Sequence, residues 1–214
     1  MRLVPVTAGG PGTFSSVTAG DGHTCAVTSS REVFCWGSNA TGQLGDGTTT
    51  DRLIPGAIPL FSDFNGEGID AGGSHTCGRL VLASDQVVCW GSNASGQLGD
   101  GSNTRRLSPA WVSGGLTFAS ISAGADHSCG VRSSGAAYCW GENAAGQLGD
   151  GTSTDRVAPA PVSGGHAFRS ISSGFTFSCG VRTDGKAYCW GENTDGRLGT
   201  GTTTNASSPA LVGP

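Results

Sequence analysis

Short alternations of apolar and polar residues run along the whole chain, separated by glycine-rich turns. In the last quarter, residues 168–172 (Phe-Arg-Ser-Ile-Ser) alternate strictly, and two further strand-like segments follow at 178–182 and 186–190. Alternation with a period of two is typical of half-buried β-strands, and no segment follows the 3.6-residue period of a helix. The pattern therefore predicts an all-β protein built from short strands.

The same set of strands recurs four times along the chain. Each copy contains a pair of cysteines, and the first of the pair recurs about every 50 residues, at Cys25, Cys77, Cys129 and Cys179. Three or four short strands within such a period indicate the blades of a β-propeller, while the glycine-rich turns exclude an α-solenoid. We expect one domain over residues 1–214, with repeats at about 14–59, 60–112, 118–162 and 168–212.

A tight hairpin inside each repeat predicts how the cysteines pair. In the last copy residues 183–185 form the loop, and counting outward along both strands places Cys179 opposite Cys189. Opposed residues of antiparallel strands lie about 4.5–5.5 Å apart at Cα, within reach of a disulfide. The second copy has two extra residues in its hairpin, which keep the same parity. We predict one bridge within each blade: Cys25–Cys35, Cys77–Cys89, Cys129–Cys139 and Cys179–Cys189.

The repeated motifs resemble those of a known family. Ala-Gly-x-x-His-Ser/Thr-Cys, then Cys-Trp-Gly-x-Asn, then Gly-Gln-Leu-Gly-Asp-Gly-Thr closely resembles the RCC1 (regulator of chromosome condensation) repeat, in the cysteine-bearing variety of bacterial surface and secreted proteins. The resemblance covers about residues 14–212. It implies a β-propeller with four-stranded blades, usually about seven to a ring. Four copies therefore predict an RCC1-like array that is a partial or open propeller.

The two ends of the chain lie in the same phase of the repeat. Pro5-Val6 precedes the first repeat as Pro161-Val162 precedes the fourth, so we expect unpaired blade edges at both ends. Three arrangements satisfy such edges: a fragment of a larger ring, two chains closing an eight-bladed ring, or head-to-tail joining into a filament. No signal peptide is visible, which favours prior cleavage or a numbering that starts within a longer precursor.

Composition narrows the location and the partners. The net charge is −4 and only 13% of residues are charged, with no basic run to follow a phosphate backbone, so we expect no nucleic-acid partner. No apolar stretch has the length of a membrane span. Eight cysteines with none left over favour an extracellular or cell-surface location. The sequons predict glycosylation at Asn39, Asn93 and Asn205.

Chemically capable residues recur with every blade, which favours structural roles for them. A histidine precedes the first cysteine in three copies, but a disulfide-bonded cysteine is no nucleophile, and the fourth copy has Phe177 in place of the histidine. Asp46 and Asp150 begin Asp-Gly-Thr segments that offer oxygen ligands to calcium, whereas two copies lack the full set of carboxylates. We therefore predict no catalytic residue, no metal site and no cofactor.

Departures from the repeat are the candidates for partner contact. The tryptophans that follow the second cysteines are expected to pack between blades. Trp111 and the pair Arg105-Arg106 stand out as unique to the second copy, as does the irregular insertion around Phe61 and Phe64. We predict that these five residues bind a partner.

Together these features predict a non-enzymatic extracellular scaffold for protein–protein interaction. The alternative is a structural subunit that assembles head-to-tail into a homo-oligomer or polymer through open blade edges. A third function, implied by the resemblance alone, is guanine-nucleotide exchange on a small GTPase. That activity is intracellular, so the disulfide pattern argues against it. The expected partner is another protein or further copies of this chain.

Overall fold

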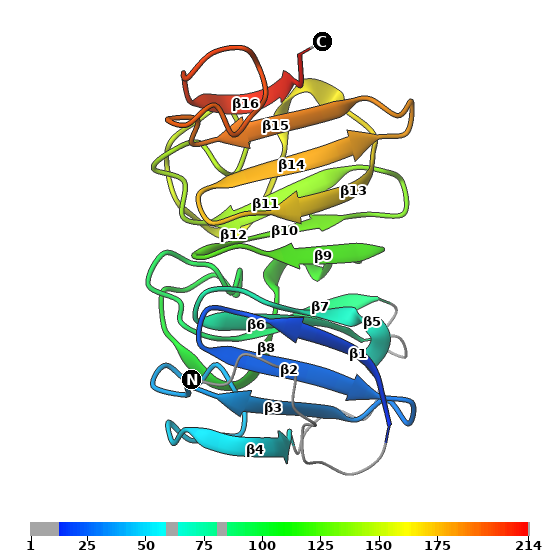
Figure 1. The fold of residues 1–214 in the computed structure, drawn as a ribbon, viewed down its shortest axis with the longest axis vertical. Helices are drawn as coiled ribbons and strands as arrows, with labels where there is room; N and C mark the ends of the chain where they lie inside the picture. The colour runs from blue at the N-terminus through cyan, green and yellow to red at the C-terminus, as the bar shows by residue number, and fades with distance from the viewer. Residues whose placement is uncertain (1–12, 59–63, 81–84, 214) are drawn as a thin grey trace, which may run out of the picture.

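The computed structural model describes residues 13–58, 64–80 and 85–213, and these form an all-β array. Their strands make four antiparallel sheets, each of four strands in sequence order. Figure 1 shows the sheets following one another along the long axis of the molecule, as the blades of an open propeller. Two short 3-10 turns, Ser113–Gly115 and Ser163–Gly165, lead from one blade to the next. The predicted fold class is confirmed.

The strand boundaries repeat from blade to blade. Blade 1 contains β1 (Phe14–Ala19), β2 (His23–Thr28), β3 (Val33–Gly37) and β4 (Arg52–Ala57). Blade 2 contains β5 (Phe64–Ala71), β6 (His75–Leu80), β7 (Gln86–Gly91) and β8 (Arg106–Trp111). Blade 3 contains β9 (Ser120–Ala123), β10 (His127–Val131), β11 (Ala137–Gly141) and β12 (Arg156–Pro161). Blade 4 contains β13 (Phe168–Ser173), β14 (Phe177–Arg182), β15 (Ala187–Gly191) and β16 (Ala206–Leu211).

The disulfides form between directly opposed residues, as the hairpin spacing predicts. In blade 4, Cys179 of β14 faces Cys189 of β15 in the strand register. The four bridges join Cα atoms only 4.0–4.2 Å apart, and they are Cys25–Cys35, Cys77–Cys89, Cys129–Cys139 and Cys179–Cys189. Within the described residues no cysteine is free. The covalent links are therefore all local, and none joins two blades.

The first strands of successive blades lie side by side, along the inner edge of the array. Their ends approach so closely that only glycine fits. A Cβ on Gly124, after β9, would lie 2.5 Å from the carbonyl oxygen of Gly174, after β13, well inside van der Waals contact. The outer strands β4, β8, β12 and β16 carry the opposite edges of the sheets.

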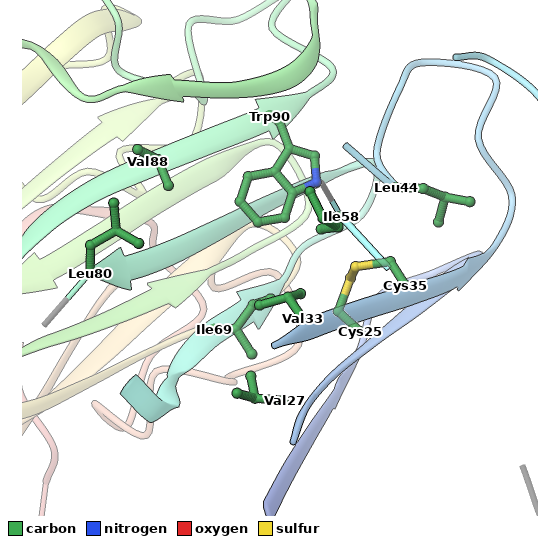
Figure 2. Close-up of a cluster of buried hydrophobic side chains, with 10 residues drawn as sticks. All are labelled: Cys25, Val27, Val33, Cys35, Leu44, Ile58, Ile69, Leu80, Val88 and Trp90. Atoms are coloured by element: carbon green, nitrogen blue, oxygen red, sulfur yellow. A yellow bond between two sulfur atoms is a disulfide. The ribbon is translucent and has the colours of Figure 1, made fainter. Parts of the chain in front are cut away.

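The hydrophobic core lies between blades. Figure 2 shows the first cluster, in which Leu44 and the Cys25–Cys35 bridge of blade 1 face Trp90 and Val88 of blade 2. Two further clusters join blade 2 to blade 3 and blade 3 to blade 4 in the same way. Trp90, Trp140 and Trp190 are fully buried at these three junctions. The expectation that the repeat tryptophans pack between blades is confirmed for these three, whereas Trp36 of blade 1 is partly exposed. None of the described residues belongs to a helix of membrane-spanning length.

Removal of one bridge tests the energetic role of the disulfides. Replacing both Cys129 and Cys139 by alanine removes the bridge across one hairpin, whose two cysteines are 10 residues apart in the sequence. Because the bridge restricts the unfolded chain, we expect the free energy of unfolding to fall by about 2–3 kcal/mol. Denaturant titration of the variant and of the wild type, without reductant, measures the difference. If reductant leaves the unfolding midpoint of the wild type unchanged, the bridges do not contribute.

Candidate functional site

A chain of buried hydrogen bonds closes each junction between blades. At the junction of blades 3 and 4, Nε2 of His127 lies 2.9 Å from Oγ of Ser178. The Ser178 hydroxyl donates to the backbone carbonyl of Gln147 at 2.9 Å, and Nε1 of Trp190 donates to the same carbonyl at 2.9 Å. The same chain recurs at the two earlier junctions, with these residues: His23, Thr76, Gln43 and Trp90, then His75, Ser128, Gln97 and Trp140.

This chain fixes the protonation of the histidines. The Ser178 hydroxyl has one hydrogen and gives it to Gln147, so Nε2 of His127 must be the donor to the hydroxyl oxygen. Burial lowers the pKa of His127 to about 4 and that of His23 to about 4. Burial, with the neighbouring histidines, lowers the pKa of His75 to about 3. The three histidines are therefore neutral at pH 7 and join blades together.

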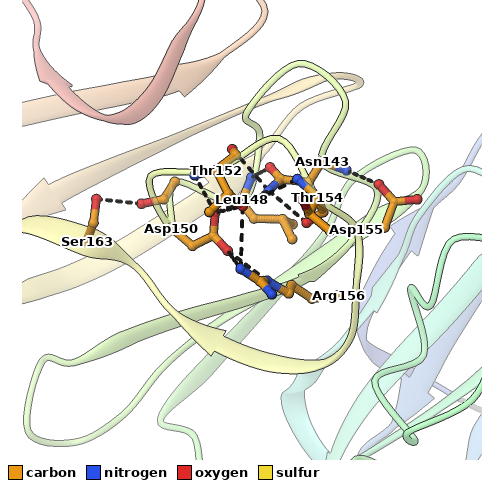
Figure 3. A network of polar contacts seen from close by, with 9 residues as sticks. Asn143, Leu148, Asp150, Thr152, Thr154, Asp155, Arg156 and Ser163 are labelled. Atoms are coloured by element: carbon orange, nitrogen blue, oxygen red, sulfur yellow. Dashed lines mark hydrogen bonds and ion pairs between the residues drawn. The ribbon is translucent and has the colours of Figure 1, made fainter.

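A buried asparagine organises the loop that follows the third strand of each blade. In blade 3, Nδ2 of Asn143 donates to Asp150, to Thr152 and to the backbone carbonyl of Thr154, at 3.0–3.2 Å (Figure 3). Its Oδ1 accepts the backbone N–H of Leu148 at 3.0 Å. Asn143 is completely buried, so the loop folds around this one amide.

The acidic residues of this loop also have partners within it. Burial alone would raise the pKa of Asp150, but hydrogen bonds from Thr152, Arg156 and Asn143 outweigh that effect and lower it. Oδ2 of Asp150 pairs with Arg156 at 2.7 Å, and Oδ1 of Asp155 accepts the backbone N–H of Asn143. The carboxylates considered as calcium ligands thus bind the protein's own donors. Among the described residues, no group of three or more His, Cys, Asp or Glu side chains is placed to hold a metal.

The same loops bury two of the three asparagines predicted to be glycosylated. Nδ2 of Asn39 donates to Asp46, Thr48 and Thr50, and Nδ2 of Asn93 donates to the equivalent groups of its own loop. Both side chains are at most 1% exposed, which leaves no path to solvent for a glycan. Asn205 is exposed, and glycosylation there stays a prediction.

Three of the residues predicted to bind a partner lie in or next to the outer strand of blade 2. Trp111, the last residue of β8, is 48% exposed, and Arg105 is exposed before β8 begins. Arg106 pairs with Asp100 at 2.7 Å, and Arg52 and Arg156 make the same pair in blades 1 and 3. Of the Arg105-Arg106 pair, only Arg105 thus has no arginine counterpart in the other repeats, and partner binding by the pair stays a prediction. Phe64 begins β5, and Phe61 lies outside the described residues.

The sequence reasoning missed an exposed apolar pair on blade 1. Leu53 is 97% exposed and Ile54 is 70% exposed, both in β4. The equivalents of Leu53 in blades 2 and 3 are Leu107 and Val157, and both are partly buried because a preceding blade covers them. The sequence did contain a signal for this exposed pair. In three repeats an apolar residue follows the arginine, which indicates that this position is normally covered by a neighbouring blade.

Acidification tests the role of the junction histidines. Because burial holds the folded-state pKa below the unfolded value of about 6.5, the unfolded state binds more protons between about pH 6.5 and pH 4. Stability is therefore complete above pH 6.5 and falls as the pH drops, by on the order of 2–3 kcal/mol per histidine at pH 4.5.

Denaturant titrations from pH 7 to pH 4.5, on the wild type and on His127→Gln, measure this effect. Glutamine keeps a neutral donor for Ser178, so we expect the variant to lose about a third of the histidine-dependent slope. Asp126 has a raised pKa, through burial and the nearby Asp21, and acts in the opposite direction. Its effect is common to both proteins and cancels in the comparison. Equal slopes would contradict the assignment.

A single substitution tests the loop amide. Asn143→Ala leaves the Leu148 N–H and two carbonyls of the loop without their partner, so we expect a loss of about 2–4 kcal/mol in the free energy of unfolding. Asn103→Ala is the control, because that exposed side chain donates a single bond, to Ala94. Similar losses in the two variants would refute the structural role of Asn143.

Comparison with known proteins agrees with the repeat geometry. The model of the regulator of chromosome condensation (RCC1) repeat matches residues 32–78, 84–131, 134–181 and 184–214. A second model of that repeat matches residues 14–43, 118–147 and 168–197. The ultraviolet-B receptor UVR8 of Arabidopsis thaliana is 38% identical over 124 residues, which cover 57% of this chain and 28% of UVR8.

Solved structures share the fold. Yeast RCC1 (Prp20), in the crystal structure with Kap60, superposes with a TM-score of 0.85 at 21% identity, over 98% of this chain and 50% of that one. The entire ectodomain of the Physcomitrella patens receptor kinase CR4 has a TM-score of 0.55 at 28% identity, over 90% of this chain and 46% of that one. The chain thus spans about half of these structures. Because the repeat model matches most of its length, the chain belongs to the RCC1 repeat family.

Proposed function

We propose that this protein is a non-enzymatic scaffold that binds another protein through the outer strand of blade 2. Cysteine and histidine, which are catalytic in many enzymes, have structural roles in this protein. The cysteines are bonded in pairs, and the junction histidines join neighbouring blades. Yeast RCC1, which has the same fold, was solved bound to Kap60, a protein partner. These observations support a role in binding.

The observation that carries this proposal is the exposure of Trp111. It faces Val88 in the strand register, and the same position holds Ala57, Pro161 and Leu211 in the other blades. A half-exposed tryptophan on an outer strand offers a large apolar surface. Arg105 adds a charged side chain at the other end of β8. Tryptophan and arginine are the residues that most often dominate binding energy at protein interfaces.

An extracellular location fits the covalent structure. Each described blade contains a disulfide, and such bridges persist in oxidising compartments. The CR4 neighbour is an ectodomain, which supports the same placement for this chain. Guanine-nucleotide exchange inside cells is not part of the proposal, because a reducing compartment would open the bridges.

Affinity measurements with matched variants test the scaffold function. The wild type is immobilised, proteins of the extracellular fraction that bind it are purified, and their dissociation constants for the wild type and for each variant are measured. We expect Trp111→Ser to weaken binding at least about tenfold, as loss of an interface hot spot does. Leu211→Ser is the control, because Leu211 occupies the same register position in blade 4 with the same 48% exposure. A purified partner that binds all three proteins equally would refute this surface.

A further inference from the structure

The three junctions inside the array share one set of apolar and backbone contacts. In the first, Leu107 of blade 2 lies against Gly42 of blade 1, where a Cβ would come within 2.6 Å of the leucine side chain. The N–H of Gly47 then donates to the carbonyl of Leu107 at 2.9 Å. The later junctions repeat both contacts, with Gly96, Gly101 and Val157, then Gly146, Gly151 and Ser207. A loop of the form Gly-x-Leu-Gly-x-Gly, at 42–47, 96–101 and 146–151, is therefore the presenting loop of each junction.

The face of blade 1 that points away from blade 2 carries the residues that receive such a loop. They are Val17, Thr24, Trp36 and Leu53, which we call the receiving face. At the inner junctions the tryptophans are 0% exposed and the residues equivalent to Thr24 are at most 1% exposed. On blade 1, Val17 is 67% exposed, Leu53 is 97% exposed, and Thr24 and Trp36 are partly exposed.

The receiving face is already in its docked geometry. The Trp36 ring lies 6.3 Å from the ring of Phe14, as the Trp140 ring lies 5.7 Å from that of Phe118 at a closed junction. Ile69, the counterpart of Val17 in blade 2, packs into the first core cluster and is 8% exposed. Half of a core cluster is thus in place on blade 1.

The last blade of a second copy is a poor match for this face. Blade 4 has Phe177 where the other blades have histidine, and Arg197 where they have glutamine. Arg197 pairs with Glu192 at 2.9 Å, and its guanidinium carbon lies 5.9 Å from the centre of the Phe177 ring. The phenylalanine ring cannot donate the hydrogen bond that histidine gives to the hydroxyl of the next blade. The salt-bridged arginine further occupies the outward surface of blade 4.

We infer that the receiving face of blade 1 docks an RCC1-type blade that presents both the junction histidine and the Gly-Gln-Leu-Gly-Asp-Gly loop, and that blade 4 of another copy does not fill this role. The histidine would donate to Thr24, the backbone carbonyl of the loop's second residue would accept from Thr24 and Trp36, and the loop would cover Leu53; the glutamine matters because its neutral side chain leaves that surface free of the Arg197–Glu192 ion pair. The outward faces of blades 1 and 4 therefore differ, because blade 4 lacks the junction histidine and glutamine.

Restoring the missing residues on blade 4 tests this inference in the full chain. Phe177→His with Arg197→Gln gives a second copy the residues that the inner junctions use. Size-exclusion chromatography with light scattering, over a wide range of concentration, measures association. We expect the wild type to stay monomeric and the double variant to associate head-to-tail, with a dissociation constant at least about tenfold lower.

Changes on the receiving face identify the contact. Adding Leu53→Asp to the double variant is expected to abolish association, whereas Ser133→Asp, in the exposed hairpin of blade 3, is the charge-matched control and should leave it intact. If the double variant does not fold by circular dichroism, Phe177→His alone is used, because three other blades accommodate histidine there.

Three results would overturn the inference. Association of the wild type as strong as that of the variant would make blade 4 of a second copy the natural occupant. A folded variant that stays monomeric would show that the histidine and glutamine do not decide docking. Association that persists with Leu53→Asp would place the contact on another surface. Trp111 lies on blade 2, so none of these results bears on the proposed scaffold function.

Discussion

Every blade of this protein depends on its neighbour to bury its apolar face. The clusters around Trp90, Trp140 and Trp190 each take the disulfide side from one blade and the tryptophan from the next. A blade on its own would leave both halves of a core in water, at a cost of roughly 25 cal/mol for each Å² of apolar surface. The fold is therefore a sum of junctions, as in other repeat proteins.

Polar contacts set how one blade sits on the next. The carbonyl of Gln97 accepts from both Trp140 and Ser128, so its lone pairs are both used inside the core. A shift of the blade by one residue would leave these buried groups without partners, which costs far more than a mismatch of apolar surface. Gly99 allows the approach, because its φ is 67° and a Cβ there would lie only 2.7 Å from the Trp140 ring. The junction thus has one register.

The sequence predicts features that depend on residue spacing within one hairpin. It does not predict the burial of residues whose cover comes from a folded loop or a neighbouring blade. Opposed cysteines follow from hairpin parity, so the bridges could be predicted without coordinates. The sequence around Asn39 does not indicate that its side chain is buried. The amide becomes buried only when residues 46–50 fold around it. The pair Arg105-Arg106 is unique in sequence, but the ion pair of Arg106 with Asp100 recurs in blades 1 and 3 as Arg52–Asp46 and Arg156–Asp150. Leu53 and Leu107 occupy the same position in their repeats. They differ in exposure, because blade 1 covers Leu107 and no described residue covers Leu53 in the same way.

Confinement of each disulfide to a single hairpin has a consequence for biosynthesis. A cysteine and its partner are separated by only 10 or 12 residues, so both leave the ribosome or translocon nearly together. Each pair can oxidise before the next repeat is made, which avoids most of the wrong pairings open to eight cysteines. Because no bridge joins two described blades, gain or loss of one repeat during evolution leaves the pairing of every other repeat unchanged.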